Sequence, residues 1–163
     1  MKIIAGLTLF IYSGFLFLGD PGTALLQTFR QREVITACLI LEAGGEGAGG
    51  MQAVMNVIQN RAKGNPCGYY AETARPRQFS SLNNAPGFLF KDYSPIIAKA
   101  HGSKSWVIAR SIVERAFAGS LPDLTGGATH YYALKIKKTP DWAPKLQETL
   151  TLKGHRFMKL ARG

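Results

Sequence analysis

Glu42 is the residue of this chain whose type and position best suit acid–base chemistry. It follows Ile35, Cys38 and Leu39 at helical spacing, so its carboxyl group shares the helix face that should turn toward the core. Apolar surroundings and the negative end of a helix dipole both favour the protonated carboxyl group, so we expect Glu42 to be a general acid. The alternative is a solvated Glu in a last helical turn before a cap at Gly44.

Glu46 and Cys67 are two further residues whose side chains could take part in a reaction. Glu46, in the Gly-rich stretch after Glu42, could repel its charge, position a substrate, act as a second carboxylate or simply be solvated in a turn. Cys67 could act as a nucleophile, with His130 or His155 as its base. The histidines lack the spacing of metal ligands, so we expect no metal and no cofactor.

The elements that must position these groups begin with helices. Apolar residues at helical spacing predict helices over residues 33–43, 51–63, 94–100 and 106–118. The last of these should bury a stripe formed by Ile108, Ile112 and Ala116. In the second, Met51 and Met55 are expected to fill the core rather than to bind a ligand.

Extended segments are expected only toward the C-terminal end. Residues 125–132 and 149–152 have the composition of strands, the second with clear alternation of apolar and polar side chains. Between the helices, the long connection over residues 64–93 is rich in aromatic residues, including Phe88 and Phe90, and is a candidate wall of a groove. Helices first and short strands last predict an α+β fold.

Composition and charge narrow the class of partner. A chain of 163 residues with 46% hydrophobic residues fits one domain with its own core. The net charge of +10, from 20 Lys+Arg against 10 Asp+Glu, favours a polyanionic partner, such as an anionic cell envelope. The sequence contains no RNP-like aromatic motif, zinc-finger spacing or long basic block, which argues against nucleic acid as the target.

The N-terminal segment has the pattern of an export signal. Residues 3–18 form an apolar run after Lys2 that is a little short for a bilayer span, although a core helix is an alternative. We therefore expect a signal peptide or signal anchor over residues 1–24, a connector over residues 25–32 and a catalytic domain over residues 33–163. Export would permit a disulfide between Cys38 and Cys67, and two unrelated thiols are the alternative.

Four groups of short sequence stretches, taken together and in this order, can be compared with the motifs of known families. They are Glu42-Ala43-Gly44-Gly45-Glu46 with Val57-Ile58-Gln59-Asn60-Arg61, Gln78-Phe79-Ser80, Pro122-Asp123-Leu124-Thr125-Gly126-Gly127-Ala128 with Tyr131-Tyr132, and Gly154-His155-Arg156-Phe157. Together they resemble the SleB-like cell wall hydrolases, the family of the spore cortex-lytic enzymes, over residues 38–157. The chain departs from that family's usual pattern at Gly44, at residues 49–51 and at Ala133.

The resemblance implies a lysozyme-like helical domain with a small C-terminal antiparallel sheet, which cleaves the glycan strands of peptidoglycan. It places the family's catalytic Glu at Glu42. The substrate-binding residues that follow from it are Glu46, Gln78, Phe79, Ser80, Thr125, His130, Tyr131 and Tyr132. The implied partners are peptidoglycan and the anionic envelope, without nucleic acid, and a membrane if the N-terminal segment is retained.

Several readings of the reaction stay open at this stage. The glycan strand could be cut by hydrolysis, as in a muramidase, or by a lytic transglycosylase, in which the sugar's own hydroxyl closes an anhydro ring. Cys67 could instead make the protein a peptidoglycan endopeptidase, or the protein could bind peptidoglycan, or be anchored to the membrane, without catalysis. The joint presence of Glu42, the Gly126-Gly127-Ala128 block and the tyrosine pair argues against both of these alternatives.

Overall fold

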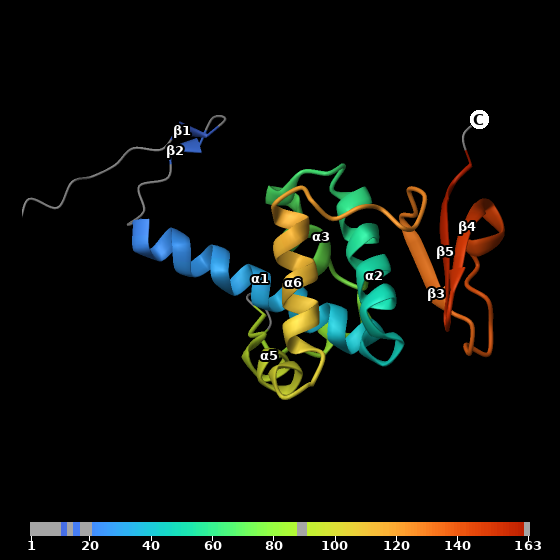
Figure 1. The fold of residues 1–163 in the computed structure, drawn as a ribbon, viewed down its shortest axis with the longest axis horizontal. Helices are drawn as coiled ribbons and strands as arrows, with labels where there is room; N and C mark the ends of the chain where they lie inside the picture. Colours follow the sequence, from blue (N-terminus) through green and yellow to red (C-terminus); the bar gives the residue numbers. More distant parts are fainter. Residues whose placement is uncertain (1–10, 13–14, 17–20, 88–90, 162–163) are drawn as a thin grey trace, which may run out of the picture.

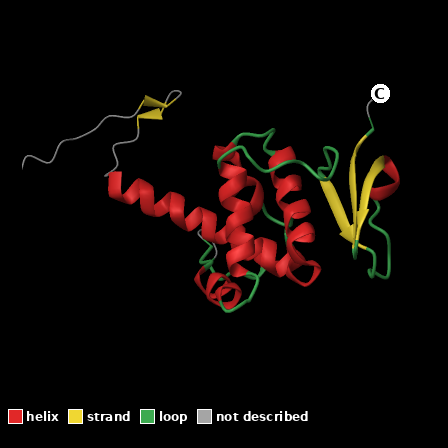
Figure 2. Ribbon diagram, viewed as in Figure 1, coloured by secondary structure: helices red, strands yellow, loops and turns green. Residues whose placement is uncertain are grey.

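The computed structural model describes residues 11–12, 15–16, 21–87 and 91–161, and it confirms the α+β fold (Figures 1 and 2). Most of the predicted signal peptide or signal anchor lies outside these residues, as do Phe88 and Phe90. Within the apolar run, β1 (Ile11–Tyr12) and β2 (Phe15–Leu16) form a short antiparallel pair. None of the helices in the described ranges has both the length and the apolar character needed to cross a bilayer.

The helices gather in one lobe, and a sheet lies beside it (Figure 1). They are α1 (Pro21–Ala43), α2 (Gly47–Arg61), α3 (Tyr69–Ala74), α4 (Ser80–Asn83), α5 (Ser94–His101) and α6 (Trp106–Phe117), with the 3-10 turns η1 (Gly44–Glu46) and η2 (Pro66–Gly68). A further 3-10 turn, η3 (Ala143–Lys145), lies beside the sheet (Figure 2). Met51 and Met55 are fully buried in the core of this lobe, as predicted. The described part of the connection over residues 64–93 is not one continuous loop, because it contains η2, α3 and α4.

Helix α1 begins at Pro21, much earlier than the predicted start at residue 33. Residues 25–32, which were expected to be a connector, are helical. The reason is that this part of α1 projects beyond the other helices (Figure 1), so Leu25 and Leu26 are each 72% exposed and no buried face marks the helix in the sequence. The division of the chain into domains stays a prediction.

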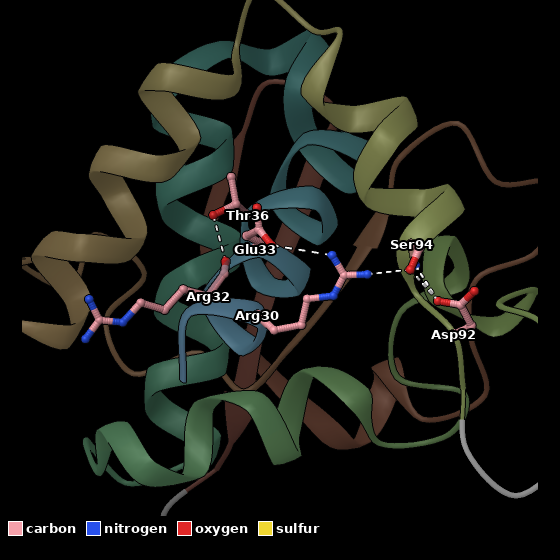
Figure 3. A network of polar contacts seen from close by, with 6 residues as sticks. All are labelled: Arg30, Arg32, Glu33, Thr36, Asp92 and Ser94. Atoms are coloured by element: carbon pink, nitrogen blue, oxygen red, sulfur yellow. Dashed lines mark hydrogen bonds and ion pairs between the residues drawn. The ribbon is translucent and has the colours of Figure 1, made fainter. Parts of the chain in front are cut away.

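Polar contacts connect α1 with the beginning of α5, as Figure 3 shows. The guanidinium of Arg30 donates to the carboxylate of Glu33 and to the hydroxyl of Ser94. Asp92 accepts hydrogen bonds from the amide and the hydroxyl of Ser94, and these bonds lower the pKa of Asp92. Within α1, the hydroxyl of Thr36 donates to the carbonyl oxygen of Arg32.

The buried face of α6 differs in one position from the predicted stripe. Ile112 and Ala116 are buried, but Ile108 is 46% exposed and its place is taken by Ala109 and Val113. The helix is thus rotated by about one residue relative to the expected face. Gly119, with φ of 69°, follows the end of the helix.

The sheet is 3-stranded and antiparallel, in the order β3-β5-β4, with β3 (His130–Ala133), β4 (Leu146–Leu152) and β5 (His155–Leu160). The extended segment predicted from residue 125 begins only at His130, because Asp123 folds the preceding residues into a turn by accepting hydrogen bonds from the amides of Thr125 and Gly127. β5 was not among the predicted extended segments. Phe157 of β5 is fully buried and packs this sheet onto α2.

Candidate active site

Glu42 lies in the last turn of α1, and its carboxylate is held by groups from two other elements. Oε1 accepts hydrogen bonds from the amide of Ser81 at 2.9 Å and from the hydroxyl of Ser80 at 3.3 Å. Oε2 accepts a hydrogen bond from the hydroxyl of Tyr131 at 3.0 Å. The preceding residues of α1 pack in the core, and Glu42 follows them at its edge, in a polar position between α4 and β3.

The carboxylate borders a groove with a volume of about 330 Å³. Of the residues predicted to contact a substrate, this groove is lined by Gln78, Ser80, Tyr131 and Tyr132, together with Glu42. The other lining residues are Arg61, Arg77, Asn83, Ala133, Ile136 and His155. Of these, only His155 had been considered from the sequence, as a groove-wall or structural residue or as a base for Cys67. The signal that could have found Arg61 is its place in one of the family-like stretches.

The remaining predicted contacts lie elsewhere. Thr125 is fully buried, and its hydroxyl donates to Asp123, so it shapes a turn and does not reach the groove. Phe79 is 1% exposed and lies behind the groove wall, with its ring centroid 6.4 Å from that of Tyr131. His130 contacts the ring of Trp142 at 5.2 Å instead of lining the groove. Glu46 also stands outside the lining and contacts His155.

Tyr131 connects Glu42 to the sheet. Its ring stacks on Phe157 at 5.6 Å and meets the ring of His155 edge to face at 5.3 Å. Burial raises the pKa of Tyr131 well above its usual value, and the charge of Glu42 acts in the same direction. The Tyr131 hydroxyl therefore keeps its proton and remains a hydrogen-bond donor to Glu42 at neutral pH.

Arg61, at the end of α2, holds the sheet against the helical lobe. Its Nε donates to the carbonyl oxygen of Thr129 at 2.6 Å, and its guanidinium lies over the ring of Phe79 at 5.7 Å. The preceding Asn60 donates to the carbonyl oxygen of Ala128 at 3.0 Å. Burial lowers the pKa of Arg61 from its usual value, but the side chain remains a cation at neutral pH and contributes positive charge to the groove wall.

The sequence that forms this groove was compared with known protein families. Residues 45–158 match the profile of a family described as Cell Wall Hydrolase. The chain belongs to the cell wall hydrolase family. No curated protein and no solved structure matches it. The matched range includes Tyr131 and His155 and begins shortly after Glu42, and the substrate that the family implies for this hydrolase is peptidoglycan.

The two cysteines of the hydrolase are both free. Cys38 is fully buried beneath the site, and burial, followed by the charge of Glu42, raises the pKa of its thiol well above the usual value. Cys67 is exposed in η2 and is not among the residues that line the groove. The disulfide that export would permit is thus not formed. Across the described ranges, no group of three or more His, Cys, Asp and Glu side chains could hold a metal ion.

The buried hydroxyl of Tyr131 predicts how the stability of the hydrolase depends on alkaline pH. Because the pKa of Tyr131 is raised above the value of 10.0 expected in the unfolded chain, its stabilising effect is fully present below about pH 10. That effect is lost as the pH rises above this value, because the Tyr131 hydroxyl ionises more readily in the unfolded chain than in the folded one. The free energy of unfolding should therefore fall more steeply above pH 10 in the wild type than in Tyr131→Phe. Urea titrations between pH 8 and about 11 measure both slopes, and equal slopes would contradict the prediction.

Proposed function

We propose that this hydrolase cleaves the glycan strand of peptidoglycan between N-acetylmuramic acid and N-acetylglucosamine, as a muramidase or lytic transglycosylase of the SleB-like type. Glu42 is the general acid and base of this reaction. The observation that carries the proposal is the position of Glu42 at the groove, where it is the only acid among the described residues that line it. A carboxyl group at a substrate groove is what glycosidic cleavage requires.

The contacts of Glu42 suit the transfer of a proton. Breaking a glycosidic bond requires a proton on the leaving oxygen, which the carboxyl group of Glu42 supplies. The carboxylate that remains accepts hydrogen bonds from Ser80, Ser81 and Tyr131, so its new charge is stabilised as it forms. Glu42 can then take a proton from water, which gives hydrolysis, or from a hydroxyl of the sugar, which gives an anhydro ring.

The walls of the groove fit a sugar polymer that carries negative charge. Gln78 and Tyr132 offer an amide and a hydroxyl to sugar hydroxyl groups, and the ring of Tyr132 offers a flat face. Arg61 and Arg77 add positive charge along the same groove. With a net charge of +10, the whole chain is attracted to the anionic envelope in which peptidoglycan lies.

The endopeptidase alternative finds less support in the geometry. Cys67 would need a histidine as base, but the ring of His130 contacts Trp142 and the ring of His155 contacts Glu46. Cys67 is also separate from the groove that contains Glu42.

Mass spectrometry of digested peptidoglycan tests the proposal. Purified peptidoglycan incubated with the hydrolase should release glycan fragments whose peptide stems are intact, because the bond that breaks lies between sugars. The Cys67→Ser variant should release the same fragments at the wild-type rate, since its thiol is outside the groove. Release of free peptides from uncut glycan, abolished by Cys67→Ser, would replace the proposal with the endopeptidase. Binding to peptidoglycan without any products would replace it with a binding protein.

A further inference from the structure

A second hollow, the cationic pocket, lies beside the groove that Glu42 borders. It has a volume of about 440 Å³, and the residues that give it its character are Arg75, Arg77, Leu82, Asn83, Lys91 and Tyr93. None of the acidic residues in the described ranges lines it. Arg77 and Asn83 line the groove as well, so the two hollows are neighbours on one surface.

The positive charge of the cationic pocket is only partly neutralised. The guanidinium of Arg75 pairs with the carboxylate of Glu72 at 2.5 Å. Arg77 and Lys91 form no ion pair with any residue that the structure describes. The ammonium group of Lys91 donates one hydrogen bond, to the carbonyl oxygen of Ala85 at 2.9 Å, and its other N–H groups can donate to a ligand. The pocket therefore offers two cations to an anion.

The backbone of Arg77 has a conformation that favours glycine. Its φ of 64° is in the left-handed region, which costs more for a residue with a Cβ atom than for glycine. The amide of Arg77 donates to Oδ1 of Asn83 at 3.2 Å and thereby holds this conformation. The NH₂ group of Asn83 is left to donate to a ligand. An arginine kept in such a conformation points to a use for its side chain.

The cationic pocket also has apolar surface. Leu82 and Tyr93 line it, and they are 5% and 8% exposed. A ligand that suits the pocket therefore combines carboxylate groups with small apolar groups. The peptide stem of peptidoglycan has both, since it contains alanine and residues with free carboxylate groups. Because the stem branches from the N-acetylmuramic acid of the glycan strand, a strand in the groove would carry its stem toward a neighbouring hollow.

We propose that the cationic pocket binds the carboxylate groups of a peptide stem while the glycan strand lies in the groove. Arg77 and Lys91 pair with the carboxylates, and Asn83 donates to them from its NH₂ group. The inference rests on the proposed cleavage of glycan strands at Glu42, and it adds a preference for strands whose stems are acidic. Binding energy from the stem can promote cleavage although the stem is remote from the bond that breaks.

Soluble, uncrosslinked glycan strands in two forms test this inference with the full chain. In one form the stem carboxylates are free, and in the other they have been converted to neutral amides. The wild type should cleave the free form with a kcat/KM about 10-fold higher. Arg77→Gln and Lys91→Gln should each lower this ratio by about 3–5-fold, the scale of one exposed ion pair. Arg77→Lys should retain more of the ratio than Arg77→Gln, because it keeps the charge.

Lys104→Gln is the matched control. Lys104 is exposed, lines neither hollow, and its replacement removes the same single charge. The ratio for this variant should equal that of the wild type. Equal losses of the ratio in Lys104→Gln, Arg77→Gln and Lys91→Gln would show only a general attraction between the basic protein and an anionic strand, and the inference would then be wrong.

The outcomes separate this inference from the proposed function. Equal kcat/KM values of the wild type for the two forms would overturn the stem site without the need for any variant. That is also the result expected if the pocket binds a phosphate-bearing polymer of the envelope instead of a stem. Glycan cleavage at Glu42 would stand in either case. By contrast, failure to cleave both forms, or the release of free peptides only, would overturn the proposed function itself.

Discussion

Glu42→Gln should lower the rate of glycan release from peptidoglycan by at least about 10²-fold, the scale of general acid catalysis. The amide of Gln has the shape of the carboxyl group, and its oxygen can still accept the hydrogen bond from the Ser81 amide. It has no proton to give to the leaving oxygen, so the loss should appear in turnover and not in folding. Initial rates of fragment release, compared at equal protein concentration, measure the effect, and circular dichroism confirms that the variant is folded.

Glu33→Gln is the matched control for this experiment. Glu33 lies on the same helix, is partly buried, and pairs with Arg30 outside the groove (Figure 3). Its replacement should leave the rate of fragment release unchanged. A Glu42→Gln variant that keeps the wild-type rate would show that another group protonates the leaving oxygen, and the proposed role of Glu42 would then be wrong.

Phe157→Ala should lower the free energy of unfolding by about 3–5 kcal/mol, as is typical when a buried aromatic side chain is truncated. Phe157 is fully buried between the sheet and α2, where it packs with Ala53, Val57 and Ala128. Its ring also stacks on Tyr131, so the cavity left behind would lie directly beneath the residue that holds Glu42. We therefore expect this variant to lose activity at temperatures where the wild type is still folded.

Urea unfolding at neutral pH measures this loss, and Leu160→Ala serves as its control. Leu160 is in the same strand but is 69% exposed, so its truncation should change the free energy of unfolding by no more than about 0.5 kcal/mol. Equal midpoints for Phe157→Ala and Leu160→Ala would contradict the packing of the sheet on α2.

Local patterns predicted the helices better than they predicted the site. The spacing of apolar residues in α1 pointed to Glu42, because a helix repeats every few residues and its buried face is visible in a short window. The partners of Glu42 were not visible in that window. Ser81 and Tyr131 lie 39 and 89 positions away in the chain, so only the tertiary fold brings them to the carboxylate.

Two residues predicted to contact the substrate lie outside the lining of the groove for the same physical reason. Thr125 was expected in the groove because it stands in a family-like stretch, but its hydroxyl is used within a turn by Asp123. Glu46 was expected there because it also stands in a family-like stretch, but its carboxylate lies against His155. In both cases a polar side chain met a nearby partner in the folded chain, and composition alone does not reveal that partner.

The order of strands in the sheet also governs when the site can form. β5 is the central strand, yet it follows both of its neighbours, β3 and β4, in the chain. The two outer strands therefore have no partner to pair with until β5 has left the ribosome. Tyr131 lacks its packing partner Phe157 for the same period. The wall of the groove that carries Tyr131 is thus completed only by a late, long-range pairing. In a nascent chain, Glu42 is therefore present well before Tyr131 can be packed in the position from which it donates to Glu42.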